Sequence, residues 1–107
     1  MVYIVTIAKY PSHLGATVGK RYLEMLQKFP PDPSLGEGIV PAAVKRTEYG
    51  LQTISLTEVA KGKLDEALER AHNQLAMFND LEDVEMSLEV YMTASEALAT
   101  VGMKLPE

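Results

Sequence analysis

The first stretch of the chain, residues 2–10, is apolar on both of its alternating faces. One face carries Tyr3, Val5 and Ile7, and the other carries Val2, Ile4, Thr6 and Ala8. A strand with two apolar faces needs cover from both sides, so it belongs in the middle of a sheet. The rest of the fold must therefore be arranged around this strand.

The remaining periodicities predict two long helices, three further strands and a short final helix. Apolar residues at helical spacing run from Val18 to Phe29 and stop at Pro30, while Ser12 and Thr17 are both candidate caps at the start. The expected strands cover residues 39–47, 51–59 and 84–92, and the expected second helix covers 63–78. A capping box at residues 93–96 predicts a last helix over 94–101.

This order predicts an α+β fold with the split pattern βαββαβ of a ferredoxin-like antiparallel sheet. Right-handed crossovers place the first and third strands in the centre, and Pro41 suits an edge strand. Both long helices then cover one face, to which we assign Tyr3, Val5 and Ile7. The opposite, helix-free face would carry a half-polar set that includes Thr6, Ser55, Glu89 and Tyr91.

Length and composition limit the class of protein. The 107 residues suit one domain spanning 1–107, and the absence of cysteine excludes disulfides and thiolate metal sites. A formal charge of −5 disfavours nucleic acid as a partner. The amino-terminal apolar run is interrupted by Thr6 and Lys9, so we expect neither a signal peptide nor a membrane span, and a cytoplasmic location.

The strand order, the size and the break at Tyr10-Pro11 resemble the dimeric α+β barrel superfamily over residues 1–92. This group includes antibiotic-biosynthesis monooxygenases, haem-degrading monooxygenases, muconolactone isomerases and stress-responsive barrel proteins. The resemblance implies a homodimer in which two helix-free sheet faces pack together. His72 resembles the axial histidine of the haem-degrading members, but the chain has no tryptophan, and we expect no cofactor.

Two residues are candidates for acid or base chemistry. His13 follows the first strand and carries an imidazole that can act as a general base, and Glu89 would become a usable acid or base in a covered cavity. The candidate ligand-binding residues are polar or aromatic groups around the same sheet: Thr6, Lys9, Tyr10, Lys45, Ser55 and Tyr91. The two histidines have no metal-ligand spacing, so no metal site is predicted.

Three functions remain open on this evidence. The preferred one is a small-molecule-binding homodimer, in which the Pro-rich segment 30–38 covers a pocket. The second is a cofactor-free monooxygenase or isomerase acting on a small organic acid or aromatic compound, with His13 or Glu89 as base. The third is a structural or protein-interaction module.

Overall fold

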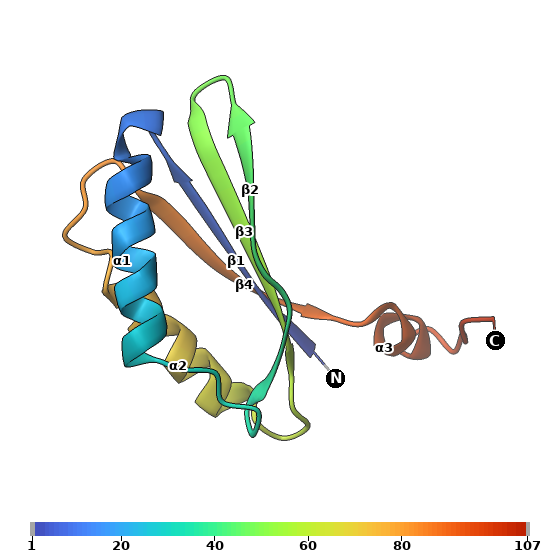
Figure 1. Ribbon diagram of the computed structural model, residues 1–107. Coiled ribbons are helices and arrows are strands. Elements are labelled where there is room, and N and C mark those ends of the chain that lie inside the picture. Colours follow the sequence, from blue (N-terminus) through green and yellow to red (C-terminus); the bar gives the residue numbers. More distant parts are fainter. Residues whose placement is uncertain (1, 107) are drawn as a thin grey trace.

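The computed structural model describes residues 2–106 and contains the expected sequence of elements (Figure 1). They are β1 (Val2–Tyr10), a 3-10 turn (Ser12–Leu14), α1 (Gly15–Lys28), β2 (Gly36–Thr47), β3 (Gly50–Val59), α2 (Leu64–Ala76), β4 (Glu85–Met92) and α3 (Ala94–Ala99). The bounds of β1 are those expected from the sequence, and β2 begins three residues earlier than expected. No helix among the described residues is long and apolar enough to cross a membrane.

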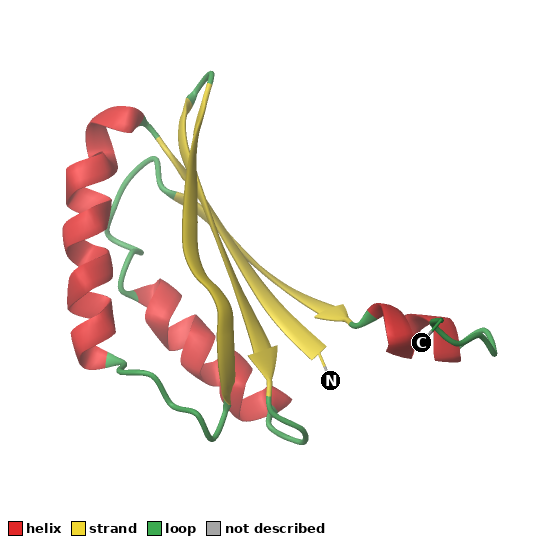
Figure 2. Cartoon of the chain, turned by 45° about the vertical axis from the view of Figure 1, so that its right-hand side comes forward, coloured by secondary structure: helices red, strands yellow, loops and turns green. Residues whose placement is uncertain are grey.

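The four strands form one antiparallel sheet in the order β2-β3-β1-β4. The central placement of β1 and β3 is therefore confirmed. Pro41 lies in the edge strand β2, next to a register shift, where a missing backbone donor is tolerated. Helices α1 and α2 cover one face of the sheet, and α3 lies on the other side of it in both views (Figures 1 and 2).

In the observed register, the face of β1 that lies under the helices is the opposite of the one we expected. Thr6 is paired with Ser55 on β3 and with Leu88 on β4, so these three side chains share one face. Leu88 packs with Ile4 against α2, which makes this the helix-covered face. Assigning Tyr3, Val5 and Ile7 to the helices was therefore wrong.

The reason for this error is that both faces of β1 are apolar. Hydrophobicity along one strand could not choose between them, and a shift of one residue in pairing exchanges the two faces. The residues of β1 that face the helices are Val2, Ile4, Thr6, Ala8 and Tyr10, and of these Ile4, Ala8 and Tyr10 are at most 7 % exposed.

Two apolar clusters hold the helices to the sheet. One joins Ala8 and Tyr10 to Val18 on α1 and to Phe78 after α2. The other joins Ile4 and Val59 to Ala67 on α2. Thr6 lies on the same face of β1, between Ala8 of the first cluster and Ile4 of the second.

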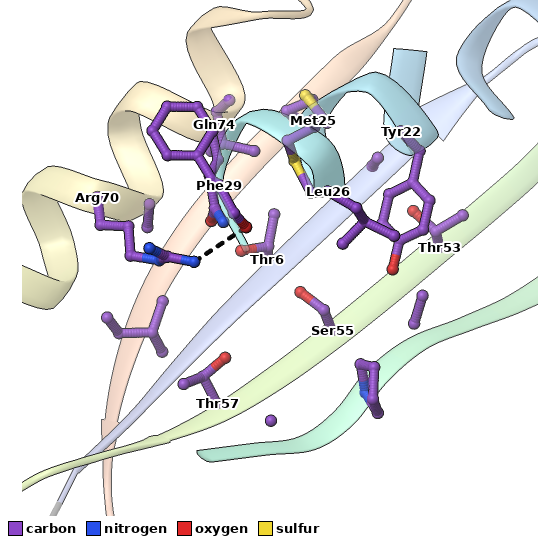
Figure 3. Close-up of a pocket in the computed structure, with 18 of the residues that line it drawn as sticks. Thr6, Tyr22, Met25, Leu26, Phe29, Thr53, Ser55, Thr57, Arg70 and Gln74 are labelled. Atoms are coloured by element: carbon purple, nitrogen blue, oxygen red, sulfur yellow. Dashed lines mark hydrogen bonds between the residues drawn. The ribbon is translucent and has the colours of Figure 1, made fainter. Parts of the chain in front are cut away.

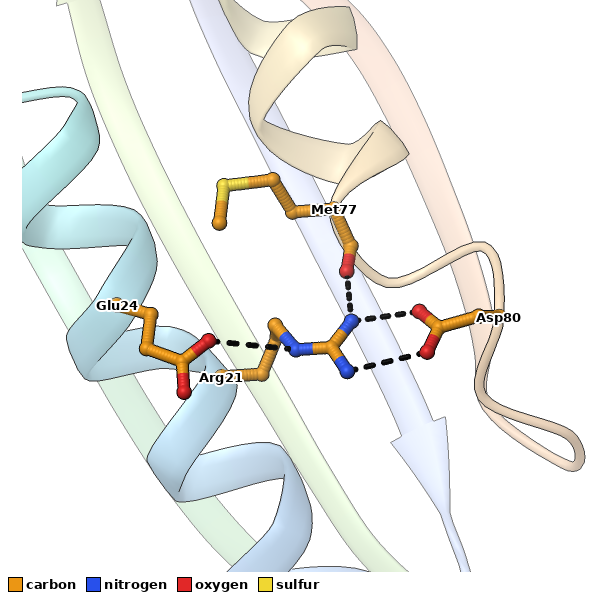
Figure 4. Close-up of polar contacts among 4 residues, drawn as sticks. All are labelled: Arg21, Glu24, Met77 and Asp80. Atoms are coloured by element: carbon orange, nitrogen blue, oxygen red, sulfur yellow. Dashed lines mark hydrogen bonds and ion pairs between the residues drawn. The ribbon is translucent and has the colours of Figure 1, made fainter.

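A polar bridge connects the two helices directly (Figure 4). The Arg21 guanidinium on α1 donates to the Asp80 carboxylate, with N···O distances of 2.5 and 3.1 Å, and also to the carbonyl of Met77. Glu24 lies 3.7 Å from the same guanidinium. Asp80 follows α2 by only a few residues, so this bridge fixes the end of α2 beside the middle of α1.

The helix ends match the sequence signals only in part. Thr93 accepts a hydrogen bond from the backbone of Glu96 at 3.1 Å, as the expected cap of α3 requires. Neither candidate cap of α1 makes such a bond, because Ser12 belongs to the 3-10 turn and the N-cap residue is Leu14. The 3-10 turn leads directly into α1 and replaces a side-chain cap.

Candidate functional site: a cavity between the helices and the sheet

A cavity of about 620 Å³ lies between the two long helices and the sheet (Figure 3). We call it the helix–sheet cavity. Its helix side is largely apolar and includes Tyr22, Met25, Leu26 and Phe29 from α1 and its end, and Ala67, Ala71, Leu75 and Phe78 from α2 and its end. Its size is within the range of pockets that enclose small organic molecules.

The sheet side of the cavity carries a row of hydroxyl groups. Thr53, Ser55 and Thr57 alternate along β3 and so point to one face, and Thr6 lies opposite Ser55 on β1. Among the described residues, none of these four side chains makes a hydrogen bond, and no buried side-chain polar atom lacks a partner. The four hydroxyls are therefore exposed to the cavity and are available to a ligand.

Tyr22 and Gln74 add polar groups from the helix side. The Tyr22 ring reaches from α1 toward the sheet (Figure 3). Tyr10 lines the cavity at the end of β1, and burial raises the pKa of its phenol. Tyr10 is thus a neutral hydroxyl near pH 7 and is not poised as a base.

The rim of the cavity is held by Arg70 on α2. Its guanidinium donates to the carbonyls of Phe29 and Pro30 at 3.1 and 2.5 Å, and it lies 5.9 Å from the centre of the Phe29 ring (Figure 3). This contact ties the start of the segment 30–38 to α2. The expected role of this segment as a cover stays a prediction, and its Pro31, Asp32 and Leu35 do line the cavity.

Asp32 stabilises the turn within that segment. Its carboxylate accepts hydrogen bonds from the Ser34 hydroxyl at 2.6 Å and from the Ser34 backbone N–H at 3.1 Å. These bonds, with the nearby charge of Arg70, lower the pKa of Asp32. Asp32 is therefore ionised at neutral pH and is a weak base.

The residues expected to form one pocket are divided between the two faces of the sheet. Thr6, Tyr10 and Ser55 line the helix–sheet cavity. Glu89 and Tyr91 lie on the helix-free face, because Glu89 is paired with Val5 and Tyr91 with Tyr3. We expected these two residues to share one face with Thr6 and Ser55. This was wrong for the same reason as the assignment of the two faces of β1.

Glu89 and Tyr91 contact each other on that helix-free face. The Tyr91 hydroxyl donates to the Glu89 carboxylate at 2.7 Å, and this hydrogen bond raises the pKa of Tyr91. Lys9 and Lys45 lie on the same face and are exposed, both opposite Gln52. The expected roles of Lys9, Lys45 and Tyr91 in ligand binding, and of Glu89 as an acid or base, stay predictions.

The two histidines lie away from the cavity. His13 is exposed in the 3-10 turn, and His72 is exposed on α2. Neither is among the described residues that line the cavity, and those residues contain no glutamate or lysine. No group of three His, Asp or Glu side chains in the described part of the chain could hold a metal ion.

Sequence reasoning missed three residues of the cavity. Tyr22 falls within the stretch of helical apolar spacing from Val18 to Phe29, and no site role was predicted for Arg70. Gln74 received no assignment, although it lies one helical turn after Arg70 on the same side. The i, i+4 spacing of Arg70 and Gln74 beside the apolar stripe was the available signal.

The helix-free face has an apolar centre and a charged rim. Paired residues define four rows across β2, β3, β1 and β4: Lys45–Gln52–Lys9–Glu85, Ala43–Ile54–Ile7–Ser87, Val40–Leu56–Val5–Glu89 and Glu37–Glu58–Tyr3–Tyr91. The two lysines lie in the first row, and the last row is acidic on the β2 side. On a solvated face, apolar side chains would not be expected to fill both middle rows across three strands.

No family model, curated protein or solved structure matches the chain.

Proposed function

We propose that the protein is a small-molecule-binding homodimer with a ferredoxin-like fold of the dimeric α+β barrel type. Each chain holds one ligand in the helix–sheet cavity, and two chains pair through their helix-free faces. The strand order β2-β3-β1-β4 with two helices on one face supports this fold assignment.

The binding function is supported by the division of the cavity into an apolar helix side and a polar sheet side. The sheet side carries the hydroxyl groups of Thr6, Thr53, Ser55 and Thr57, which we call the hydroxyl floor. Thr6 and Ser55 stand next to each other at the centre of the floor and have no hydrogen-bond partner among the described residues. Apolar side chains of α1 and α2 face them across the cavity. The matching ligand is a flat or elongated apolar molecule with oxygen substituents along one edge.

The residues of the cavity favour binding over proton-transfer catalysis. Its described lining contains only Asp32 and Arg70 as charged groups, and Asp32 has a lowered pKa. A general base should have a pKa near the working pH. His13 and Glu89, the bases expected from the sequence, lie outside the cavity.

The helix-free face supports a dimer because its charges complement each other under two-fold symmetry. A two-fold axis parallel to the strands puts Lys45 of one copy opposite Glu85 of the other, whereas an axis across the strands puts Lys45 opposite Glu37. In both arrangements the apolar middle rows cover each other.

The test of binding uses 1-anilinonaphthalene-8-sulfonate as a fluorescent probe and two competitors that differ in one hydroxyl group. We expect the probe to fluoresce on binding, and 2-naphthol to displace it at a concentration roughly fivefold lower than naphthalene, as one hydrogen bond of about 1 kcal/mol requires. Equal displacement by both compounds would contradict the proposed hydroxyl floor.

Matched variants locate the bound probe. Ser55→Leu fills the centre of the floor and should reduce probe binding, while Ser87→Leu makes the same change on the opposite face of the sheet. Loss of binding in the Ser87→Leu variant alone would place the ligand on the helix-free face and reject the cavity. Sedimentation velocity of the unmodified protein tests the dimer separately.

A further inference from the structure

Residues 93–106, the part of the described chain that follows β4, lie apart from α1 and α2 (Figures 1 and 2). This C-terminal arm, residues 93–106, contains α3 and the residues that follow it. It extends from the end of β4 and stands apart from the rest of the chain in both views (Figures 1 and 2). Neither core cluster of the described chain includes a residue after Leu88.

The arm nevertheless has a defined local structure. Thr93 caps the start of α3, and Gly102, with a φ of 75°, closes the turn that follows the helix. The N–H of Met103 donates to the carbonyl of Leu98 at 2.9 Å, and the N–H of Gly102 donates to that of Ala99 at 3.1 Å. These two bonds form a Schellman motif, which fixes the direction of the chain after α3.

A helix of six residues does not hold its shape in water without tertiary contacts, since isolated helices below about 12 residues are marginal. The arm also exposes large apolar side chains: Val101 is 68 % exposed, Met103 58 % and Leu105 49 %. The short capped helix and the three exposed apolar residues after it would therefore be stabilised by packing against another surface.

The position of the arm indicates what covers it. The arm lies on the side of the sheet that α1 and α2 leave open, which is the space that a second copy occupies in the proposed dimer (Figure 2). It is also continuous with β4, whose Tyr91 and Glu89 belong to the helix-free face. A second chain placed on this face therefore meets the arm.

The area of the sheet face leads to the same conclusion. Four strands spaced about 4.8 Å apart, over about eight paired residues, give a flat footprint of roughly 500 Å² per copy. A stable interface usually buries about 800 Å² per partner. The exposed apolar side chains of the arm would add to the area that the sheet face buries.

We infer that two copies of this chain exchange their C-terminal arms, each arm packing its apolar side chains onto the other copy around the paired helix-free faces. This inference rests on the proposed dimer. Because the exchange is reciprocal, it closes the assembly at two chains.

The first test is an isotope-filtered NOE experiment on dimers that contain one ¹³C-labelled and one unlabelled copy. We expect intermolecular contacts from the methyl groups of Val101, Met103 and Leu105. We also expect contacts across the sheet faces, between Ile7 and Ile54 for an axis parallel to the strands, or from Ile7 to Val5 and from Ile54 to Leu56 for an axis across them. Sheet contacts without arm contacts would overturn the arm exchange and leave the dimer standing. A monomer at all concentrations would overturn both.

The second test changes the arm in the full-length chain. The double variant Val101→Glu and Met103→Glu should raise the dimer dissociation constant by roughly tenfold or more in sedimentation equilibrium. Tyr49→Glu is the matched control, because Tyr49 is 88 % exposed at the β2–β3 turn and lies outside the arm. An unchanged constant for the double variant, or oligomers larger than dimers for the unmodified protein, would overturn the exchange.

Discussion

Thr6 and Ser55 are paired across β1 and β3 on the face of the sheet that the helices cover, and both hydroxyls face the helix–sheet cavity. This pair lies at the centre of the row of hydroxyl groups that lines the sheet side of the cavity. The first prediction concerns its role in recognising a ligand.

We expect the combined variant Thr6→Val and Ser55→Ala to abolish the roughly fivefold preference of the cavity for 2-naphthol over naphthalene, since about 1 kcal/mol of hydrogen bonding is lost. Affinity for naphthalene should stay the same or rise. Competition against the fluorescent probe measures both values. Ser87→Ala removes a hydroxyl from the opposite face, and a similar loss of preference in that variant would contradict the prediction.

Gly50 supports the end of β1 from the β2–β3 turn. It has a φ of 147°, and a Cβ atom at this position would lie 2.3 Å from the carbonyl oxygen of Tyr10. We expect Gly50→Ala to lower the free energy of unfolding by about 3 kcal/mol, measured by urea denaturation. Gly62→Ala, with a φ of 77° and open space around its Cβ, should cost only about 1 kcal/mol. Equal costs would show that the contact with Tyr10 is unimportant.

Arg70 ties the segment 30–38 to α2 through the carbonyls of Phe29 and Pro30. Arg70→Met should release this tether, lower stability by about 1 kcal/mol and speed the dissociation of the bound probe in stopped-flow measurements. Lys61→Met removes a positive charge from an exposed position before α2 and serves as control. If both variants release the probe at the wild-type rate, the segment does not cover the cavity.

The Arg21–Asp80 ion pair predicts a pH dependence of stability. The hydrogen bond from Arg21 lowers the pKa of Asp80 in the folded state. Its stabilisation is therefore fully present above the unfolded pKa of about 4, and is lost as the pH falls through the lower folded value. In Asp80→Asn the thermal midpoint should be lower at pH 7 and should fall less steeply in acid.

Glu82→Gln provides the control for this pH dependence. Glu82 is an exposed carboxylate near Asp80 and forms no ion pair within the described chain. Its variant should follow the wild-type curve of midpoint against pH. If the thermal midpoint of Asp80→Asn falls with pH as steeply as that of the wild type, the bridge to Arg21 does not contribute to folding.

Charge exchange on the helix-free face tests the symmetry of the proposed dimer. Lys45→Glu should weaken dimerisation by roughly fivefold at low salt, because Lys45 faces a carboxylate of the second copy in either arrangement. Recovery by Glu85→Lys would identify a two-fold axis parallel to the strands, and recovery by Glu37→Lys an axis across them. If neither change restores the affinity, the two faces do not pair as proposed.

The sequence by itself determined which segments become strands and helices and in what order. Alternation and helical spacing are local properties, and Val2–Tyr10 could therefore be delimited without its neighbours. The cap at Thr93 and the edge position of Pro41 are local for the same reason, since each depends on the backbone needs of one or two residues.

Only the tertiary structure decided which face of β1 the helices cover. With apolar residues on both faces, the choice depends on the pairing of Thr6 with Ser55 and Leu88, which are distant in sequence. That register also placed the cavity under the helices and moved Glu89 and Tyr91 to the other side of the sheet. The contacts of Arg21 and Arg70 join segments more than 35 residues apart, so no local pattern could have indicated them.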